Sequence, residues 1–378
     1  MRIAFVAPAY WPAEAFGGPI WVLRSLAREL ALRGHAVDVW TTSLERVDRR
    51  GSLLTRTATV DAATVRYLST PLRYRWMGIT PTLLLHLGRV PRPDVAHIFG
   101  FRDPIGFLGA AWFRHHRVPY VFEALGMFTP KLRKLALKRA LDRTLLASLP
   151  RGAAAVVAAS GIERGEYLAA GLPAGRILIR PNGVPEAPQE RSGVLRRRLG
   201  LEGEPLVLYV GRVADGKGLD LLVHALPELP DAHLAIVGPD DGHGTTRALR
   251  QLAGALGVAS RVHLLGQWPE QPLALYADAE VLALPSRHEN FGMAAAEAAA
   301  AGVPVLVSDR CGVAELLRDR GALVVGYDGR EVQEALARLL ADPELRRSLG
   351  AAGALSAREL AWPHVAELQE SIYRHVLV

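Results

Sequence analysis

Short apolar runs alternate with stretches of helical periodicity along the first half of the chain. Six runs have the length and composition of buried strands: IAFVAP (3–8), AVDVWTT (36–42), DVAHIFG (94–100), VPYVFEA (118–124), AAVVAAS (154–160) and RILIRPNGV (176–184). Between several of them apolar positions recur with a helical period, as over 19–33, and Gly34 is placed to end that helix. Nearly continuous apolar strands that alternate with helices predict a parallel sheet covered on both faces.

The second half repeats the alternation. Its strands are predicted at PLVLYVG (205–211), AHLAIVG (232–238), RVHLLGQ (261–267), AEVLALPS (279–286), VPVLVSD (303–309) and GALVVG (321–326). A chain of 378 residues is also longer than the roughly 250–300 residues at which single cores stop growing. We therefore expect an α/β protein of two doubly wound domains, over 1–184 and 185–361, with a hinge near VPEAPQE (184–190) and a final helix over 362–378.

The composition of the chain excludes several classes of protein. Half of the residues are apolar and 22% are charged, which is globular composition, and no apolar stretch approaches the ~18 residues of a membrane-spanning helix. The opening MRIAFVAPAYWP is too short for a signal peptide and is interpreted as a first buried strand. Cys311 is the only cysteine, which excludes a disulfide framework and a cysteine-based metal site. We expect a soluble protein of a reducing compartment, the cytoplasm.

The net charge of +7 is unevenly distributed along the chain. Residues 1–190 hold 26 Lys and Arg against 14 Asp and Glu, whereas residues 191–378 hold 19 against 24. This asymmetry, with the basic pieces RYRW (73–76) and KLRKLALKRALDR (131–143), favours docking of the first domain on the anionic inner face of the cell membrane. The alternatives are a basic domain that binds an acidic sugar or stays solvated, and simple composition drift in an arginine-rich proteome.

The segment SRHENFGMAAAEAAAAG (286–302) places two carboxylates around the start of a helix. A strand ends before it, Glu289 lies in the following loop, and Glu297 lies one turn into an alanine-rich helix that begins at Met293. Open α/β sheets bind ligands at the carboxyl ends of their strands, and the free N–H groups of a helix start attract anions. The segment therefore combines backbone N–H groups that can donate hydrogen bonds to a phosphate with two carboxylates that can accept hydrogen bonds from sugar hydroxyls. A capping carboxylate on a buried alanine helix is the alternative.

The segment YVGRVADGKGLD (209–220) offers two cations. Arg212 and Lys217 flank a glycine-rich loop between a strand and a helix, where they suit a diphosphate leaving group without a metal ion. The chain has no Asp-x-Asp motif, which is the usual magnesium clamp of another class of sugar transferase. It also lacks GxGxxG and GxxxxGK[ST], which argues against a dinucleotide dehydrogenase and a P-loop NTPase. A surface loop with a structural salt bridge is the alternative.

Three features of the first half carry candidate residues. Gly17 and Gly18 precede a helix and allow a close backbone approach to a ligand, although a plain tight turn has the same pattern. His97 and Glu123 close two predicted strands and are expected to face a cleft between the domains. For His97 a satisfied core histidine is the alternative, whereas a carboxylate after an apolar strand, as at Glu123, is unusual.

These pieces together resemble the retaining glycosyltransferases of family 4, which have the GT-B fold. The resemblance is carried by Gly17-Gly18, by GRVADGKG (211–218) and by SRHENFGMAAAEAAAAGVPV (286–305), which matches the family's E-x7-E signature. It covers essentially the whole chain and is looser in the first half. It implies two Rossmann-like domains that face each other across a cleft, an acceptor-binding domain over 1–184 and a nucleotide-sugar-binding domain over 185–361, with the helix 362–378 packed back on the first domain.

The resemblance also implies roles for individual residues. Arg212 and Lys217 hold the diphosphate, Glu297 accepts hydrogen bonds from the ribose, and Glu289 contacts the donor sugar. The implied donor-binding set is Gly17, Gly18, Gly211, Gly266, Gln267, Asn290, Phe291, Gly292, Met293 and Glu297, with Gly266 and Gln267 at the nucleobase. The implied catalytic set is Glu289, Arg212, Lys217, His97 and Glu123, and Gly126 and Met127 lie on the acceptor side. The motif around His97 is poor and Glu123 departs from the family pattern, so the identity of the acceptor is not carried over.

The mechanism implied is transfer with retention at the anomeric carbon, in which the leaving diphosphate takes the acceptor's proton and no dedicated protein base is needed. The expected partners are a nucleotide-diphosphate sugar and a glycan, lipid-linked or small-molecule hydroxyl, with no metal, cofactor or nucleic acid. Two other classes remain open. A nucleotide-sugar 2-epimerase would need further acid–base residues around the sugar, and a non-catalytic sugar-nucleotide sensor would not need the complete set of clamp residues.

Overall fold

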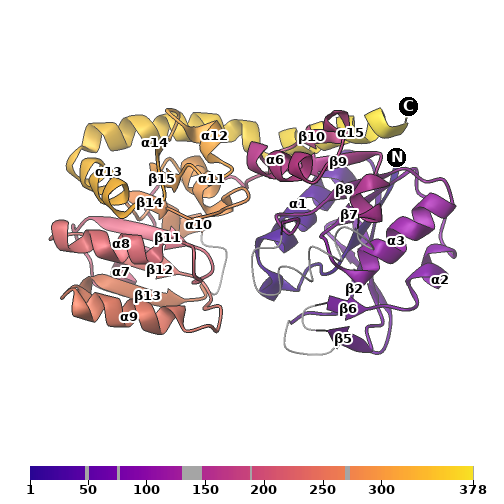
Figure 1. Cartoon of the computed structure of the whole chain (residues 1–378), viewed down its shortest axis with the longest axis horizontal. Helices are drawn as coiled ribbons and strands as arrows, with labels where there is room; N and C mark the ends of the chain where they lie inside the picture. Colours follow the sequence, from indigo (N-terminus) through magenta and orange to yellow (C-terminus); the bar gives the residue numbers. More distant parts are fainter. Residues whose placement is uncertain (47–50, 75–76, 130–146, 188–189, 269–272, 378) are drawn as a thin grey trace. The chain divides into compact units, whose positions relative to one another are not determined.

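A computed structural model describes the chain except residues 47–50, 75–76, 130–146, 188–189, 269–272 and 378 (Figure 1). The basic run 131–143 and residues 75–76 of RYRW therefore lie outside the described residues. The chain divides into two compact units. Unit 1 contains Met1–Gly183 and Trp362–Val378, and unit 2 contains Val184–Ala361.

Unit 1 is built on an eight-stranded sheet in the order β10-β9-β8-β7-β1-β2-β4-β3. Its strands are β1 (Arg2–Ala7), β2 (Ala36–Thr42), β3 (Arg56–Val60), β4 (Ala63–Leu68), β7 (Val95–Phe99), β8 (Tyr120–Glu123), β9 (Ala155–Ala158) and β10 (Ile177–Ile179). All neighbours pair in parallel except β3, which runs antiparallel to β4 at the edge of the sheet. The inner strands are buried on both faces, which explains their continuous apolar runs.

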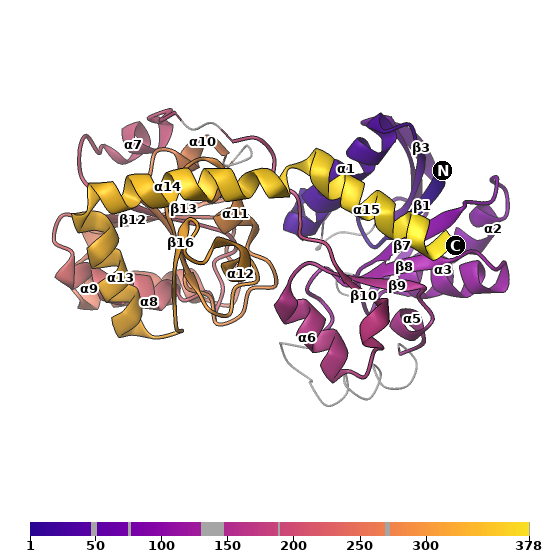
Figure 2. The same cartoon turned by 90° about the horizontal axis from the view of Figure 1, so that it is seen from above.

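Helices and one hairpin complete unit 1. They are α1 (Gly18–Leu32), α2 (Leu83–Leu87), α3 (Pro104–His115), α5 (Ser148–Arg151), α6 (Gly161–Ala169), α15 (Trp362–Leu377) and the hairpin of β5 (Leu72–Tyr74) and β6 (Met77–Ile79). Helices α15 and α1 are in contact, and Figure 2 shows α15 crossing α1. Gly183 packs against the ring of Trp362, because a Cβ on that glycine would lie 2.4 Å from Trp362 Cδ2. The end of the chain thus belongs to the core of unit 1.

Unit 2 is a six-stranded parallel sheet in the order β13-β12-β11-β14-β15-β16. Its strands are β11 (Leu206–Val210), β12 (His233–Val237), β13 (Val262–Gly266), β14 (Val281–Leu284), β15 (Val305–Ser308) and β16 (Ala322–Val325). Its helices are α7 (Val194–Leu199), α8 (Leu219–Ala225), α9 (Thr245–Ala255), α10 (Leu273–Tyr276), α11 (Met293–Ala300), α12 (Ala314–Leu317), α13 (Gly329–Ala341) and α14 (Pro343–Ala357). Because the strands are parallel, the loops after β11, β12, β13 and β14 meet at one edge of the sheet.

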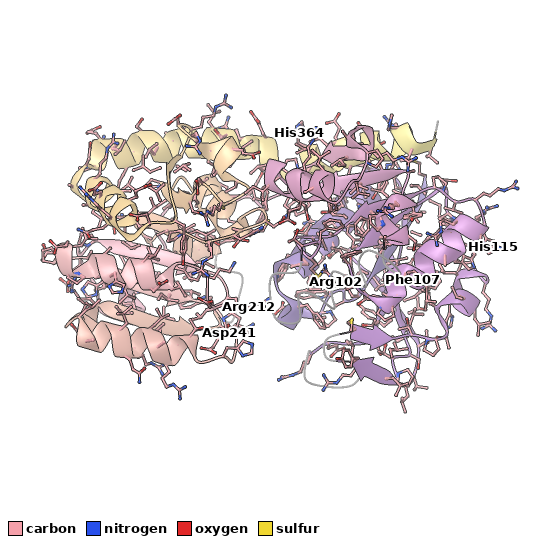
Figure 3. The ribbon with its side chains drawn as sticks, in the orientation of Figure 1. Arg102, Phe107, His115, Arg212, Asp241 and His364 are labelled. Carbon is pink, nitrogen blue, oxygen red and sulfur yellow. The ribbon has the colours of Figure 1, made fainter. Side chains whose placement is uncertain are left out.

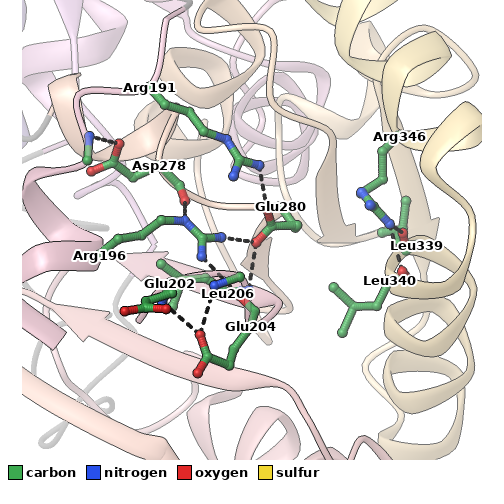
Figure 4. Close-up of polar contacts among 12 residues, drawn as sticks. Arg191, Arg196, Glu202, Glu204, Leu206, Asp278, Glu280, Leu339, Leu340 and Arg346 are labelled. Atoms are coloured by element: carbon green, nitrogen blue, oxygen red, sulfur yellow. Dashed lines mark hydrogen bonds and ion pairs between the residues drawn. The ribbon is translucent and has the colours of Figure 1, made fainter. Parts of the chain in front are cut away.

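A polar cluster fixes the beginning of unit 2 (Figure 4). Asp278 accepts hydrogen bonds from the backbone N–H groups of Gly193 at 2.6 Å and Leu195 at 2.9 Å. It thereby pairs N–H groups at the start of α7 that have no partner within the helix. Glu280 accepts from the Arg196 side chain at 2.5 Å and from the Leu206 N–H at 2.7 Å. These contacts join α7 to the first residue of β11, whose opposite end carries the loop 211–218.

The alanine-rich helix α11 is short and closely packed. Its inward residues Ala295, Ala296, Ala298 and Ala299 are fully buried. Two glycines of α14 face this region, because a Cβ on Gly353 would lie 3.4 Å from Ala299 Cβ and a Cβ on Gly350 would lie 2.1 Å from the Gly302 carbonyl oxygen. The small side chains therefore allow two helices to approach closely, and they fix the start of α11 at the sheet edge.

Candidate active site

Three loops of unit 2 are joined through their backbones at the carboxyl edge of the sheet. The N–H of Gly211 donates to the Val237 carbonyl at 2.9 Å, and the N–H of Gly238 donates to the Gly266 carbonyl at 2.8 Å. A Cβ on Gly238, at φ +146°, would lie 1.8 Å from the Gly211 carbonyl oxygen. This contact requires glycine and fixes the loop after β11 against the loop after β12.

The same loop is joined on its other side to the loop after β14. The N–H of Arg287 donates to the Gly216 carbonyl at 2.8 Å. Gly218 adopts φ +70°, and a Cβ there would lie 2.1 Å from the Pro285 carbonyl oxygen. The two segments singled out in the sequence, 209–220 and 286–302, are therefore adjacent in space.

This junction brings Lys217 and Glu289 together. Their side chains form an ion pair with Lys217 Nζ 2.5 Å from Glu289 Oε2, and both remain partly exposed. Glu289 is held by its backbone, which accepts from the Gly312 N–H at 3.0 Å and donates to the Arg310 carbonyl at 3.0 Å. Arg212 is exposed on the same loop as Lys217, and Figure 3 shows it beside Asp241, whose N–H donates to the Val213 carbonyl.

The start of α11 is the next part of the site. Gly292 caps the helix at φ +98°, and a Cβ there would lie 2.5 Å from Cys311 Sγ. Phe291 is buried, and its carbonyl accepts from the Val313 N–H at 2.7 Å. Asn290 and Met293 flank this turn and are partly exposed. The N-terminal end of α11 therefore lies at the same edge of the unit 2 sheet as Glu289.

Glu297 lies one turn into α11 and is only partly exposed. The Tyr276 hydroxyl donates a hydrogen bond to Glu297 Oε2 at 2.6 Å. Burial raises the pKa of the Glu297 carboxyl to about 7, and the Tyr276 hydrogen bond offsets only part of this rise. Tyr276 was not among the predicted residues, because its contact depends on α10 packing against α11.

A cavity of about 270 Å³ lies beside the predicted nucleobase position. Gly266 lines it at the end of β13, whereas Gln267 follows on the exposed loop. Apolar side chains form part of its wall, and Asp240 and Arg250 add polar groups. Asp240 and Arg250 were not predicted as site residues. The signal available for them was the glycine- and aspartate-rich loop PDDGHG (239–244) after a predicted strand.

The glycines predicted near the N-terminus begin a helix in unit 1. Gly17 has φ +83° and ψ −155°, a conformation that favours glycine, and it caps α1. Gly18 is the first residue of α1, and a Cβ there would meet no atom within 4 Å. Gly18 is therefore required neither by its conformation nor by a close neighbour within the described structure.

Gly126 and Met127 lie in the loop after β8. Gly126 adopts φ +75°, and its N–H donates to the buried carboxylate of Glu163 at 2.9 Å. The Met127 carbonyl accepts from Arg102 at 2.5 Å. Arg102 is labelled in Figure 3, follows β7 and has the unusual φ of +64°. Two charged side chains thus hold this loop at the carboxyl edge of the first sheet.

The prediction that His97 and Glu123 face an open site is wrong. His97 lies in the middle of β7 rather than at its end, and both side chains are completely buried. One nitrogen of Arg180 lies 2.6 Å from each carboxylate oxygen of Glu123, and His97 Nε2 lies 3.4 Å from Glu123 Oε2. The other ring nitrogen of His97 lies 2.7 Å from the Tyr373 hydroxyl of α15.

This buried network shifts the ionisation of its members. Burial lowers the pKa of His97, an effect that its contact with Glu123 opposes. Burial works to raise the pKa of Glu123, but Arg180 and His97 outweigh it and hold that pKa below its ordinary value. The network joins β7, β8 and α15, so it is part of the framework of unit 1.

Two family models match the chain. The model for glycosyl transferases group 1 matches residues 193–355, and the glycosyl transferase 4-like domain matches residues 17–183. The chain belongs to the group 1 glycosyltransferases of family 4. The two matches cover nearly all of the two units of this glycosyltransferase and confirm the resemblance drawn from its motifs.

Individual relatives are similar over different lengths. A D-inositol 3-phosphate glycosyltransferase of Nocardia farcinica is 40% identical over 184 residues, which are 46% of this glycosyltransferase and 41% of that relative. The match thus spans about half the length of such curated relatives.

Solved structures of low sequence identity share the fold. Sucrose-phosphate synthase of Thermosynechococcus elongatus matches with a TM-score of 0.79 at 22% identity, over 99% of each chain. Anabaena HepE, solved in complex with UDP and glucose, matches with a TM-score of 0.77 at 19% identity, over 98% of each chain. The predicted α/β fold with two Rossmann-like domains of the GT-B type is confirmed.

Two kinds of feature are absent from the described residues of the glycosyltransferase. No helix among them has both the length and the apolar character needed to cross a membrane. In the same residues, no group of three or more His, Cys, Asp and Glu side chains is arranged to hold a metal ion.

Proposed function

We propose that this glycosyltransferase moves a sugar from a nucleotide-diphosphate sugar to a hydroxyl acceptor, with retention at the anomeric carbon and without a metal ion. The observation that carries the proposal is the Lys217–Glu289 pair at the junction of two glycine-rich loops and the start of α11. The Anabaena HepE structures, solved with UDP and glucose and with UDP-glucose, support a nucleotide-sugar donor. The relatives named D-inositol 3-phosphate glycosyltransferase support sugar transfer. The acceptor is a glycan, a lipid-linked sugar or a small molecule.

Within unit 2 the proposed donor site runs along the sheet edge. Lys217 and Arg212 bind the diphosphate, and the free N–H groups at the start of α11 face its charge. Glu289 accepts from hydroxyls of the transferred sugar and orients Lys217 through their ion pair. Glu297 accepts from the ribose hydroxyls, and the nucleobase enters the cavity beside Gly266.

The proposed reaction needs no basic side chain. The bond between the anomeric carbon and the diphosphate oxygen breaks, and its electron pair leaves with the diphosphate. The acceptor hydroxyl attacks from the same face of the sugar, and its proton passes to the departing diphosphate oxygen. Lys217 and Arg212 stabilise the negative charge that grows on the leaving group, which is where fixed cations lower a barrier most.

The direct test is incubation with a panel of nucleotide-diphosphate sugars in the presence and absence of EDTA. We expect release of nucleoside diphosphate with one donor class, an α-linked product from an α-configured donor, and full activity in EDTA. NMR of the product reports the anomeric configuration. An inverted product would overturn retention, and loss of activity in EDTA that Mg²⁺ restores would overturn the metal-free reaction. Conversion of the donor to its 2-epimer, or binding without turnover, would overturn the transferase.

Donor binding should depend on pH through Glu297. Its pKa of about 7 means that the carboxylate is mostly protonated at pH 6 and mostly ionised at pH 8. The ionised form accepts stronger hydrogen bonds from the ribose, so donor affinity should rise by up to about tenfold between these values. The diphosphate of the donor does not titrate in this range. Calorimetric titration at pH 6, 7 and 8 measures the effect.

The matched control for this prediction is Glu289→Gln, which neutralises the other carboxylate of the same site, the one paired with Lys217. Glu297→Gln should weaken donor binding at pH 8 and abolish its pH dependence, whereas Glu289→Gln should retain the dependence. The same pH dependence in Glu297→Gln as in the wild type would remove Glu297 from the donor site. Ionisation also carries a cost in the free protein, so without donor the contribution of Glu297 to the unfolding free energy of unit 2 should fall as pH rises towards 7.

A further inference from the structure

The hairpin of β5 and β6 in unit 1 has an unusual distribution of side chains. Its cross-strand pairs are Leu72 with Ile79, Arg73 with Gly78, and Tyr74 with Met77. In an antiparallel pair, residues directly opposite each other lie on the same face, and successive residues alternate between faces. One face of the hairpin therefore carries Arg73 and Gly78, and the other carries four apolar or aromatic side chains.

The position of Gly78 shows which face points inward. A Cβ on Gly78 would lie 2.8 Å from Thr70 Cγ2, 2.9 Å from Thr42 Cγ2 and 3.0 Å from Leu44 Cδ1. The face of Arg73 and Gly78 thus packs on unit 1. The apolar face points away from the protein, with Leu72 and Tyr74 59% exposed and Ile79 37% exposed. This is the reverse of the usual pattern for a sheet with one solvated face.

A neighbouring loop extends the apolar surface. The carbonyl of Ser52 accepts from the Thr70 N–H at 2.9 Å, which fixes the loop beside the segment that leads into β5. The next two residues of this loop, Leu53 and Leu54, are 72% and 77% exposed. We call Leu53, Leu54, Leu72, Tyr74 and Ile79 the hairpin patch. Figure 1 shows the hairpin at one end of unit 1.

The chain around the hairpin patch is strongly basic. Residues 43–92 contain nine arginines and three acidic residues. Arg56, two residues after Leu54, has a side chain that is 56% exposed and lies 3.7 Å from the similarly exposed Glu45, a surface pair that anionic headgroups can replace. An apolar surface within a basic segment is complementary to an anionic bilayer, because the arginines bind headgroups while the apolar side chains enter the interface.

We propose that the hairpin patch docks unit 1 on an anionic lipid surface, and that it does so to present the active site to a lipid-linked or membrane-bound acceptor; the second clause rests on the proposed function. A second copy of the chain is a poor occupant, because a symmetric contact would bring two basic segments together. The patch contains no residue of the basic run 131–143. Anionic headgroups match both its charge and its exposed leucines.

The first experiment is co-sedimentation with phosphatidylglycerol–phosphatidylcholine vesicles at low and high salt. Leu72→Glu should weaken binding about tenfold, because it removes an apolar side chain that enters the lipid interface and adds a negative charge. Leu32→Glu is the matched control: Leu32 is 65% exposed on α1 of the same unit, and the charge change is identical. It should change binding less than threefold, since its charge acts only at long range. No binding at low salt, equal binding to neutral vesicles, or equal loss in both variants would overturn the proposal.

A second experiment detects insertion. Cys311 is the only cysteine and is buried, so a cysteine introduced at position 72 or 32 can be labelled selectively in the folded protein. An environment-sensitive dye on Leu72→Cys should shift its emission to shorter wavelengths with anionic vesicles, and the same dye on Leu32→Cys should not. No shift at position 72 would contradict insertion of the hairpin patch.

The tests of membrane docking and of the proposed transferase activity can fail independently of each other. Donor turnover with a soluble acceptor needs no membrane, so Leu72→Glu should leave it unchanged. Turnover without vesicle binding would overturn the docking surface alone. Vesicle binding without turnover would overturn the transferase and leave the surface standing. Sedimentation velocity completes the test, because a wild-type dimer that Leu72→Glu converts to a monomer would show that the patch contacts a second copy instead.

Discussion

Replacing Lys217 by alanine is expected to lower kcat by roughly 30- to 1,000-fold, equivalent to about 2–4 kcal/mol of transition-state stabilisation. The ammonium lies 2.5 Å from Glu289 and is only partly exposed, so it is already positioned before donor arrives. A preorganised cation costs no reorganisation when charge develops on the diphosphate. Steady-state kinetics with saturating donor measures the change.

Arg212→Ala should lower kcat by a similar factor, because Arg212 is the second cation proposed to stabilise the charge on the leaving diphosphate. Arg330→Ala is a matched control, since Arg330 lies on α13 of the same unit and its side chain is 86% exposed. It should alter kcat less than threefold, as expected for a surface change. Unchanged kcat in Lys217→Ala, with normal unfolding behaviour, would contradict the proposed leaving-group clamp.

Replacing Arg180 by alanine is expected to destabilise unit 1 by about 3–5 kcal/mol, because it leaves the fully buried Glu123 without its cation. This is a large share of the ~5–15 kcal/mol that typically separates folded from unfolded domains. The double replacement Arg180→Met with Glu123→Gln should cost less, since it removes both charges together. Urea unfolding followed by a probe in unit 1 measures the difference.

Arg176→Ala provides the control, because Arg176 is an exposed arginine just before β10 and surface changes stay near 0.5 kcal/mol. Acid should weaken the same network. The folded-state pKa values of Glu123 and His97 both lie below their ordinary values, so unfolding takes up protons. Stability should therefore fall as pH drops below about 6.5, first through His97 and then through Glu123. A kcat loss in Glu123→Gln without any loss of stability would contradict this structural role.

The alternation of strands and helices could be predicted because the inner strands of both sheets are buried on two faces. Strands β1, β7 and β11 are continuous apolar runs for this reason. Strands β3 and β4, and the hairpin of β5 and β6, were not predicted. Edge strands and hairpins have mixed surfaces, and Leu72 and Tyr74 even reverse the expected pattern.

The donor-side residues could be predicted because their positions follow from local features, namely a strand end, a glycine and a helix start. Glu289 and Lys217 lie 72 residues apart in sequence, yet each lies in the loop that follows a parallel strand, and such loops meet at one edge of the sheet. His97 could not be placed in the same way. Its environment is set by Tyr373, 276 residues away, and a single sequence does not show this contact.

The contribution of α15 to unit 1 has a consequence for how the protein is made. Unit 2 is one continuous segment, whereas unit 1 needs Trp362, Val365 and Tyr373, which are buried in its core. Ribosomes add roughly 5–20 residues per second, and domains usually fold in order from the N-terminus. Because α15 is synthesised after unit 2, Val184–Ala361 can fold before unit 1 is complete. Until α15 leaves the exit tunnel, nascent Met1–Gly183 exposes the surface of α1 that α15 covers in the folded protein.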